Sequence, residues 1–494
     1  MADKHEECTQ NDCLCEIETN HNEKKSDGIS DFIKDWNEVA ANIESTPKEI
    51  IIKVKHSDPE RIDLVATRLI NKYNFKTAEE SNTVYLHTGK IYDNKKAEAI
   101  IRKETEIQIE NCTKHDTLEV IEKIKRKTFE DLKDFDSDPN VLTLENGILN
   151  LQTMELSPHT PTNLSKVLIP CNYIEPFSKD IKENLKDTLF WKYLESSFTI
   201  NGKVNEESIE TVLEIMASAF LKRNIDEKSV MFLGTGENGK SVCLDYLSAL
   251  LGKDNVSHIP LQVLAEDKFA SARLDGKHAN IFSDLEKNEL RHTGIIKDLS
   301  SAEPIHAQHK NKTGFDLYPF AKLIFSTNRF PKSFDQSQGF FRRWIIVKWQ
   351  RNFENDPDRI NDLKKQLLSN PSERDIVFST LIHISRRLLD SNKFTHSKDW
   401  KTIQKEWNAN ADPLDDFIEN HIVESEGNRT KIETYQFYKR TMFSKSETPL
   451  GLGKFGKAFA EYFEDSKNDR ARIWLNIDFK EPKQESLEEF DNHE

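Results

Sequence analysis

The chain has 494 residues, of which 36% are hydrophobic and 31% charged; its mean hydropathy is -0.69 and its formal net charge is -15. This length allows about three domains, and no apolar run approaches the roughly 20 residues that a membrane span requires. The N-terminus also lacks the apolar stretch of a secretion signal. We therefore expect no membrane partner and an intracellular, cytoplasmic location.

Both ends of the chain are polar and acidic. Residues 1–45 are predicted to be a disordered tail and residues 481–494 a second acidic tail, because both carry many acidic and few basic side chains. The first tail contains Cys8, Cys13 and Cys15. Flanked by His5 and His21, they could ligate zinc, but their spacing matches no compact zinc-binding module. We favour chance cysteines in a disordered tail, and the sequence leaves metal binding open.

Residues 46–215 are predicted to form a mostly helical α+β region. Apolar side chains at helical spacing predict an amphipathic helix over residues 60–73. Residues 141–151 are typical of a hairpin, with Asn146-Gly147 suited to a type I′ turn between two alternating strands. Residues 179–222 are typical of a helical stretch throughout.

Residues 230–251 predict a strand, a glycine-rich loop and a helix. The loop fits G-x-x-x-x-G-K-[ST], in which glycines let backbone N–H groups surround phosphate oxygens. Lys240 would neutralise the β- and γ-phosphates, and Ser241 would offer its hydroxyl to Mg²⁺. The predicted nucleotide site consists of Gly234, Thr235, Gly236, Glu237, Asn238, Gly239, Lys240 and Ser241.

Two further strands are predicted to end beside this loop. HANIFSDLEK places Asp284 after an apolar strand, where a carboxylate can hold the Mg²⁺ water shell and polarise the attacking water. Glu286 is a candidate partner in that second role. AKLIFSTN ends in Asn328, whose amide can orient water or contact the γ-phosphate. The alternatives without a functional role are that Asp284 and Glu286 are ordinary surface carboxylates and that Asn328 only forms a turn.

Basic side chains mark two other segments. GFFRRWIIVKW places Arg342 and Arg343 at the start of an apolar strand, where a guanidinium can stabilise a transferring phosphoryl group; a plain surface pair is the alternative. Between the strands of Asp284 and Asn328, the sequence predicts a hairpin whose tip carries His309, Lys310 and Lys312. Such a tip can grip a phosphate backbone or can be a solvated turn.

The order of glycine loop, acidic strand, basic hairpin, Asn-ended strand and Arg-Arg strand resembles superfamily 3 helicases. It is most similar to the phage/plasmid primase-helicase group, which includes the poxvirus primase-helicase. The resemblance covers roughly residues 60–480. It implies an α/β fold with an AAA+ P-loop ATPase core at 216–350, a helical connector at 351–410 and a C-terminal winged-helix domain at 411–480.

The resemblance also implies roles for the motor residues. Lys240 and Ser241 match the Walker A pair, Asp284 matches the Walker B acid, although the family often has Glu there, and Asn328 matches the sensor Asn. The implied cofactors are ATP and Mg²⁺, with Ser241 and Asp284 serving the metal.

By the same resemblance, either Arg342 or Arg343 would act as a finger that reaches the neighbouring subunit's ATP. Lys310 and Lys312 would lie in the hairpin that lines the central channel of a homo-hexamer. One departure is Ser301-Ala302-Glu303, which stands where the family commonly has Gly-Gly-Asp, so the way the hairpin is held stays open.

The flanking regions add two expectations. Asp134, Asp136 and Asp138 could suggest primase metal ligands, but we interpret them as a loop and expect a separate primase or polymerase to act as partner. The basic stretch from Arg429 to Arg472 includes a recognition-type helix, TPLGLGKFGKAFAEYF, and a wing strand, ARIWLNI. This favours DNA binding, with protein docking as the alternative.

These features predict an ATP-dependent replicative DNA helicase of a virus, phage, plasmid or integrated mobile element, acting inside a host cell. By resemblance it would translocate 3′ to 5′ on single-stranded DNA at a fork. Two alternatives stay open: an ATP-dependent DNA-binding initiator or switch without unwinding, and a small-molecule kinase. The Arg-Arg strand and the winged-helix region argue against the kinase.

Overall fold

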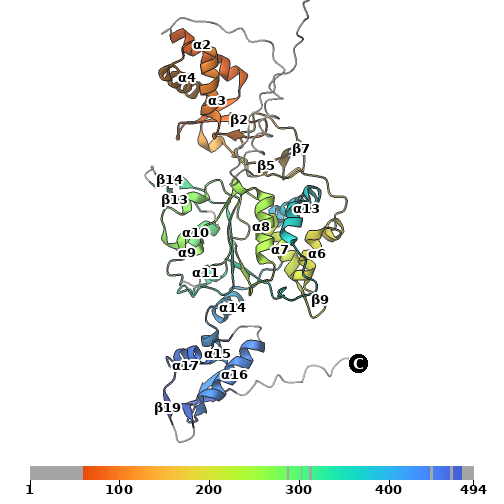
Figure 1. Cartoon of the computed structure of the whole chain (residues 1–494), viewed down its shortest axis with the longest axis vertical. Helices are drawn as coiled ribbons and strands as arrows, with labels where there is room; N and C mark the ends of the chain where they lie inside the picture. The colour runs from red at the N-terminus through yellow and green to blue at the C-terminus, as the bar shows by residue number, and fades with distance from the viewer. Residues whose placement is uncertain are drawn as a thin grey trace, which may run out of the picture.

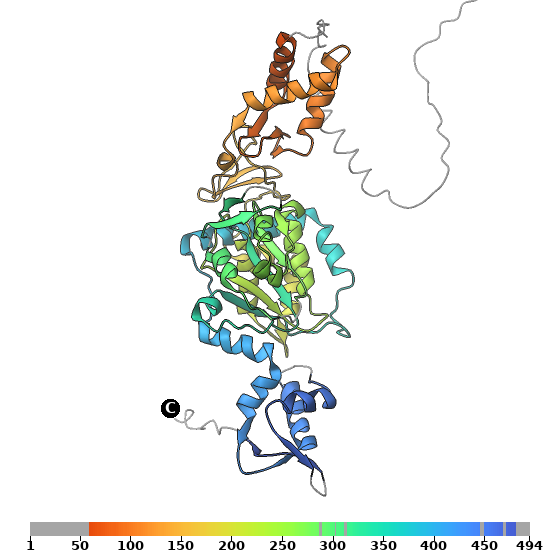
Figure 2. The same ribbon diagram turned by 90° about the vertical axis from the view of Figure 1, so that its left-hand side faces the viewer.

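A computed structural model describes residues 59–285, 289–301, 303–310, 314–444, 449–467 and 471–480. The molecule is elongated, with an N-terminal part, a larger central part and a C-terminal part following one another along its long axis (Figure 1). The view from the side shows the same succession (Figure 2). Both predicted tails, the three N-terminal cysteines, Glu286 and Lys312 lie outside the described residues. None of the described helices is both long and apolar enough to cross a membrane.

The N-terminal part packs three helices on a small sheet in the order β3-β2-β1-β4. The predicted helix is confirmed as α2, and its Arg61 side chain is buried against Asp116 at 2.6 Å. Asp116 also closes the capping box with Thr113 at the start of α4. The elements are α2 (Pro59–Lys72), β1 (Phe75–Ala78), β2 (Thr83–His87), β3 (Tyr92–Asp93), α3 (Ala97–Gln108), α4 (Lys114–Lys127) and β4 (Phe129–Glu130).

The predicted hairpin at 141–151 is confirmed, but its turn lies one residue earlier. Leu144 of β5 (Val141–Leu144) pairs with Gly147 of β6 (Gly147–Asn150), so Glu145-Asn146 make the turn. Gly147 serves a different need, because an added Cβ would lie 2.5 Å from the Ser157 carbonyl oxygen of β7 (Leu156–Ser157).

The predicted helical stretch at 179–222 is interrupted by a second hairpin. Asn201 and Gly202 both have positive φ, 51° and 75°, which is the requirement of a two-residue type I′ turn. They join β8 to β9 between helices α6 and α7. The segment contains α5 (Ile181–Leu185), α6 (Leu189–Ser197), β8 (Thr199–Ile200), β9 (Lys203–Val204) and α7 (Glu206–Ser218).

The central part contains a five-stranded sheet in the order β11-β12-β15-β10-β16, and every pair of neighbours is parallel. This confirms the expected α/β fold. Such a sheet is covered by helices on both faces, which explains its nearly continuous apolar strands. The strands are β10 (Ser229–Leu233), β11 (Val256–Ser257), β12 (Ala279–Phe282), β15 (Lys322–Thr327) and β16 (Trp344–Lys348).

Alternate residues of each strand enter different hydrophobic clusters. Val230 and Phe232 face α7, α8 and α13, whereas Met231 and Leu233 face α9, α10, α11 and α14. Figure 1 shows these two helical layers on opposite sides of the sheet. The covering helices are α8 (Lys240–Leu251), α9 (Leu261–Glu266), α10 (Gly294–Ser301), α11 (Gln338–Phe341), α13 (Pro371–Ser391) and α14 (Trp400–Ala411).

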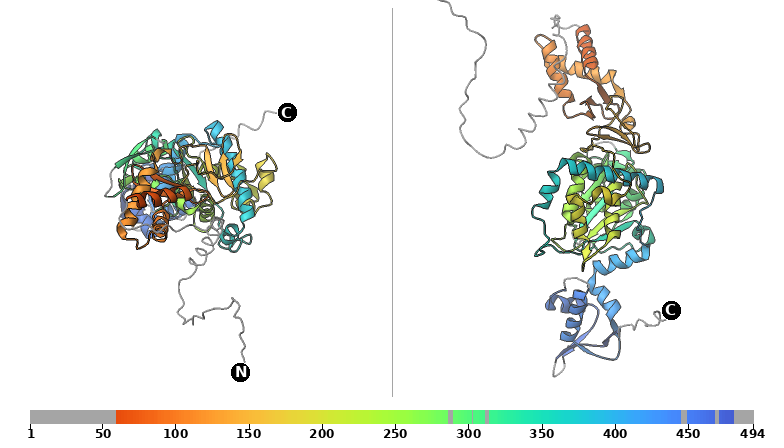
Figure 3. Two further views of the ribbon diagram at one scale, coloured as in Figure 1. Left: turned by 90° about the horizontal axis from the view of Figure 1, so that it is seen from above. Right: turned by 90° about the vertical axis from the view of Figure 1, so that its right-hand side faces the viewer.

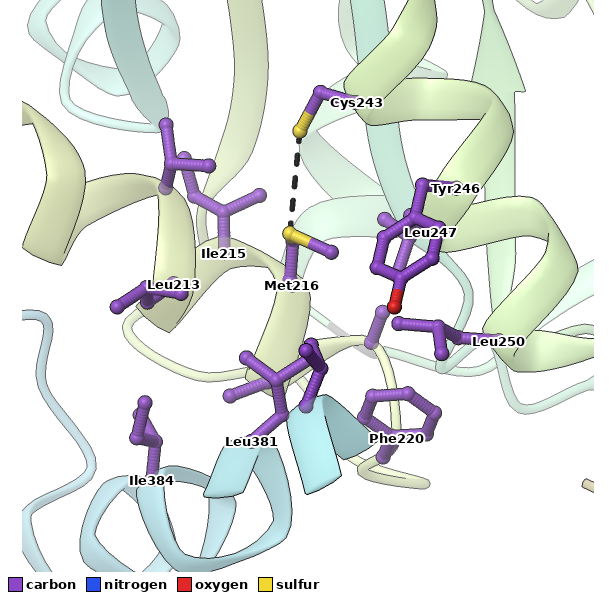
Figure 4. Close-up of a cluster of buried hydrophobic side chains, with 14 of the residues drawn as sticks. Leu213, Ile215, Met216, Phe220, Cys243, Tyr246, Leu247, Leu250, Leu381 and Ile384 are labelled. Atoms are coloured by element: carbon purple, nitrogen blue, oxygen red, sulfur yellow. Dashed lines mark hydrogen bonds between the residues drawn. The ribbon is translucent and has the colours of Figure 1, made fainter. Parts of the chain in front are cut away.

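Helix α8 is fixed by a tight apolar contact with α7 and α13 (Figure 4). The Cys243 thiol lies 3.9 Å from the Met216 sulfur, and Leu381 of α13 points into the same cluster. Interiors of this kind are packed as densely as organic crystals, so they resist small displacements. The packing therefore fixes where α8 begins, which is the end of the glycine loop.

The C-terminal part has its own core, which includes Phe417, Tyr438, Phe459 and Trp474. It is seen below the sheet in the right panel of Figure 3, joined to the central part through α14. Its strands form the sheets β18-β20-β19 and β17-β21. The elements are α15 (Pro413–His421), β17 (Ile422–Glu424), β18 (Arg429–Thr430), α16 (Lys431–Ser444), α17 (Leu452–Phe459), β19 (Asp465–Lys467), β20 (Arg472–Trp474) and β21 (Ile477–Phe479).

Candidate functional site

The glycine loop connects the carboxyl end of β10 to the first turn of α8. Gly239 has φ 90°, and Glu237 has φ 58°. A side chain on Gly234 would lie 2.2 Å from Asn238 Nδ2 and 2.4 Å from the Trp349 carbonyl oxygen. Two of the loop's glycines are therefore required, Gly234 by close contact and Gly239 by backbone conformation.

Three carbonyl groups of the loop are held by residues outside it. The Gly236 oxygen accepts a bond from Asn352 Nδ2 at 3.3 Å, and the Glu237 oxygen accepts one from the Phe353 N–H at 2.7 Å. The Tyr193 hydroxyl donates to the Gly239 oxygen at 2.8 Å. Burial raises the pKa of Tyr193 well above its ordinary value, so this hydroxyl remains a donor.

The N–H groups of the loop have no such partners. Within the described part of the chain, none of the backbone N–H groups of residues 235–241 donates a hydrogen bond. In a trans peptide the N–H points away from the C=O. The N–H groups that share a peptide with the three held carbonyls, those of Glu237, Asn238 and Lys240, therefore point away from the groups that hold them. A row of free amides at a helix N-terminus is a binding site for an anion.

Lys240 lies at the centre of this loop and is only 5% exposed. Its Nζ atom donates to the carbonyl oxygens of Gly234 at 2.5 Å and Thr235 at 3.2 Å, and to Asn238 Oδ1 at 3.1 Å. Burial lowers the pKa of Lys240 to about 8, and the negative charge of Asp284 partly offsets that effect. The positively charged ammonium group of Lys240 therefore lies beside the free amides of the loop.

The predicted polar side chains come together at the same edge of the sheet. Asn328 follows β15 and brings its Oδ1 within 3.5 Å of Lys240 Nζ, and Asp284 follows the neighbouring strand β12. Ser241, Asp284 and Asn328 all line one cavity of about 1020 Å³ together with the loop. Asp284 has φ 68°, an uncommon conformation that clusters at functional sites.

The cavity offers donors suited to a phosphate and to a hard cation. Free amides and Lys240 match phosphate oxygens, and the Ser241 hydroxyl and Asp284 carboxylate are oxygen ligands of the kind that Mg²⁺ takes beside phosphates. The residues present therefore fit a magnesium nucleotide.

The two predicted arginines lie at the opposite end of the sheet. Trp344, which follows them, pairs with Ser229 at the start of β10, whereas the loop follows Leu233 at its end. Five strand residues span about 16 Å. Arg342 and Arg343 both pair with Glu227, so neither is near the glycine loop of its own chain.

The arginines also differ from each other. The Arg343 side chain is 12% exposed and bonds the Gly339 carbonyl oxygen, whereas the Arg342 side chain is 44% exposed. Burial and the charge of Arg342 lower the pKa of Arg343. Arg343 is thus the more rigidly held guanidinium.

The predicted basic hairpin is present as β13 (Ile305–Gln308) and β14 (Gly314–Leu317). His309 and Lys310 are exposed at its tip, and the His309 ring stacks on Phe315 with centroids 5.7 Å apart. A Cβ on Gly314 would lie 2.3 Å from the ring of the exposed His306, so a side chain there would displace that ring. Lys310 makes no ion pair with any described residue.

Sequence reasoning missed one wall of the cavity. Tyr193 and Ser196 of α6 line it, and so do Phe353 and residues 358–364. These segments lie about 40 residues before and about 120 residues after the loop, so only tertiary structure brings them together. No motif marks them, although Arg359 within NDPDRIND is a cation in an otherwise acidic segment.

Two family descriptions match the chain. A family described as "D5 N terminal like" matches residues 24–199. A family of unknown function (DUF5906) matches residues 232–343. The second range begins within β10 and ends at Arg343, so it contains the glycine loop, Asp284, Asn328 and both arginines.

Curated relatives come from large DNA viruses. "Putative primase C962R" of African swine fever virus (isolate Pig/Kenya/KEN-50/1950) is 21% identical over 464 residues, which cover 88% of this chain and 44% of that protein. "Putative helicase L207/L206" of Acanthamoeba polyphaga mimivirus is 21% identical over 48% of this chain and 24% of its own length. The chain therefore spans less than half of the relatives it matches.

Among solved structures, the chain is similar to the C-terminal region (305-718) of NrS-1. That match has 10% sequence identity and a TM-score of 0.43, and it covers 85% of this chain and 100% of that one.

Proposed function

We propose that this chain, which belongs to the phage and viral primase-helicase group, is a ring-forming, ATP-driven DNA helicase of viral or mobile-element replication. The observation that carries this proposal is the row of loop amides without a described acceptor beside the buried Lys240, with Asp284 and Asn328 at the same sheet edge and the arginines at the far edge. A site divided in this way would be completed by a second copy.

Each residue of the loop edge would have a distinct role. The amides of residues 235–241 and Lys240 would hold the β- and γ-phosphates of ATP. Ser241 and Asp284 would hold Mg²⁺, which supplies positive charge to the phosphates when bound. Asp284 would also polarise the attacking water, and Asn328 would orient it or contact the γ-phosphate.

The order of the strands supports an ATPase of this kind. The strand that carries Asn328 is inserted between the strand of the glycine loop and the strand of Asp284. Parallel strands present their carboxyl ends at one edge, where ligands of open α/β sheets bind. The three groups therefore face one ligand from three neighbouring strands.

The arginines support a shared site. Because Arg342 and Arg343 start β16 rather than end it, they would act on the nucleotide of a neighbouring subunit. An arginine supplied in this way raises the rate of phosphoryl transfer by orders of magnitude. A heterologous contact that repeats around an axis closes a ring, and a homo-hexamer is what the family resemblance favours.

Two surfaces would bind DNA. The β13–β14 hairpin carries Lys310, which forms no ion pair with the residues that the structure describes, and we propose that this hairpin moves one strand through the ring. The C-terminal part has the order of helices and strands typical of a winged helix, namely α15, β18, α16, α17, β19 and β20. We propose that it docks duplex DNA at the fork.

DNA-stimulated ATP hydrolysis, measured together with displacement of a strand from forked DNA, tests the proposal. A helicase shows both, and Lys240→Ala abolishes both. An initiator or switch would bind DNA and hydrolyse ATP without displacement. Hydrolysis indifferent to DNA would contradict the motor and favour a small-molecule kinase.

A further inference from the structure

The cavity has a second half that the motor residues leave unassigned. Beside the glycine loop, part of its wall is made by residues of the segment 351–364, here called the strap, which lies between β16 and α12 (Leu363–Leu368) and includes the start of that helix. Phe353, Ile360 and Leu363 contribute apolar surface to the cavity. The loop binds only phosphates, so the remaining space must take the rest of any ligand.

The strap and Trp349, which lies just before it, are joined to the loop. The Trp349 N–H donates to the Leu233 oxygen at 2.7 Å, and the Trp349 oxygen accepts from Asn238 Nδ2 at 3.0 Å. The Phe353 N–H then donates to the Glu237 oxygen. The start of the strap is thus held against the loop by main-chain hydrogen bonds on both sides of Arg351.

Arg351 joins the first residue of the strap to its middle and to α6. Its guanidinium binds Asp356 at 2.7 Å, Asp358 at 2.6 Å and the Ser196 carbonyl oxygen at 2.9 Å. Its guanidinium carbon also lies 5.0 Å from the centre of the Phe353 ring. Lys364 closes the far end on Asp245 of α8 at 2.5 Å. The strap is therefore positioned by α6, α8 and the loop together.

One ion pair between lining residues of the cavity also joins the loop to the strap. Arg359 Nη2 lies 3.4 Å from Glu237 Oε2, and both side chains are about half exposed. Glu237 is an acid placed within a loop whose amides favour an anion, so its charge opposes the ligand. Arg359 offsets that charge. A guanidinium binds a phosphate with two parallel hydrogen bonds, which is stronger than an exposed pair with a carboxylate.

We propose that the strap is the nucleoside half of the site and that Arg359 exchanges Glu237 for the phosphates when a nucleoside triphosphate binds. The base and ribose lie against Phe353 and the apolar side chains of the strap. Arg359 becomes a second cation on the triphosphate, supplied by the same chain as Lys240. This inference rests on the proposed ATPase function and deepens it.

Calorimetric titration of the full-length chain with ATP and with inorganic tripolyphosphate, both with Mg²⁺, separates the two halves of the site. Arg359→Ala should raise the dissociation constant of both ligands, by roughly tenfold to hundredfold. Phe353→Ala should raise that of ATP by roughly tenfold and leave tripolyphosphate within twofold. Glu237→Gln should tighten tripolyphosphate, because it removes the opposing charge.

Arg102→Ala is the matched control. Arg102 pairs with Glu98 at 3.4 Å and is 42% exposed, close to the values for Arg359, but it lies on α3. Its variant should bind both ligands as the wild type does. If Phe353→Ala misfolds, Phe353→Leu keeps the apolar contact area and should weaken ATP less.

The outcomes separate this inference from the proposed function. Failure of ATP to bind, or binding that Lys240→Ala leaves unchanged, contradicts the ATPase itself. Binding that depends on Lys240 but changes by less than twofold in both Arg359→Ala and Phe353→Ala contradicts only the strap. Equal losses of ATP and tripolyphosphate in Phe353→Ala would contradict the nucleoside assignment.

Discussion

Two glycine-rich segments of this chain each carry lysine, but they differ in construction. In the loop, Gly234 is packed against Asn238 and Trp349, and Lys240 is buried among hydrogen-bond acceptors. In α17 and its N-cap, a Cβ on Gly451, Gly453 or Gly456 would meet nothing within 4 Å. Lys454 and Lys457 beside them are exposed and make no ion pair within the described part of the chain.

The difference indicates that the loop is a preformed binding site, whereas α17 presents an exposed surface. A buried lysine and glycines that admit no side chain specify one small ligand of fixed shape. Exposed lysines on a short helix, with glycines that bring the backbone to the surface, suit a large charged partner that approaches from outside. Phe455 and Phe459 anchor the other face of α17 in the core. The following four experiments test this contrast, beginning with the largest expected effect.

Gly234→Ala should abolish nucleotide binding and lower the free energy of unfolding by about 1–3 kcal/mol, because the new methyl group overlaps a main-chain oxygen. Denaturant unfolding and calorimetric titration measure the two effects. Gly236→Ala is the control for stability, since a Cβ there meets nothing within 4 Å. Equal stability of the two variants would contradict the close packing of the loop.

Nucleotide affinity should fall as the pH rises above about 8, the pKa to which burial lowers Lys240. Bound phosphate favours the charged form and raises that pKa, so binding takes up a proton between the two values. The dissociation constant should then rise by up to about tenfold per pH unit. Calorimetry in buffers of different ionisation enthalpy measures the proton uptake, and release of protons would contradict it.

Lys454→Gln and Lys457→Gln should weaken DNA binding several-fold without affecting tripolyphosphate. Each should also reduce the slope of log K against log salt by about 1, as expected for a lost phosphate contact. Fluorescence anisotropy with duplex DNA at several salt concentrations measures the slope. An unchanged slope would favour a protein partner for this face.

Gly456→Ala should raise the free energy of unfolding by about 0.5–1 kcal/mol, because the helix gains a better former and loses no contact. The same substitution should reduce DNA affinity if the backbone approaches DNA closely at this point. Thermal unfolding and anisotropy measure the pair of effects. A destabilised variant would mean that this glycine is as constrained as Gly234.

Much of the phosphate half of the site could be predicted from the sequence. Gly234 to Ser241 form a local pattern, and Asp284 and Asn328 follow apolar strands, so parallel pairing brings them to one edge. The same reasoning placed Arg342 and Arg343 at a strand start. These predictions needed only short-range patterns and the rule that parallel strands share their direction.

The strap and the loop contacts of α6 could not be predicted in this way. The sequence pattern predicts only that Tyr193 is one more apolar residue of a helix and that residues 351–364 are a charged connector. Their roles arise from contacts between distant segments, which periodicity does not encode. The hairpin at Asn201-Gly202 is different, because its turn signal was present and was overridden by the helical pattern around it.

The most direct test of the account mixes two inactive variants. Lys240→Ala subunits keep the arginines, and subunits with Arg342→Ala and Arg343→Ala together keep the glycine loop. If each nucleotide is shared between neighbours, an equal mixture should recover ATP hydrolysis at about one interface in four. No recovery at any ratio, with both variants folded and assembled together, would contradict a site completed by a second copy.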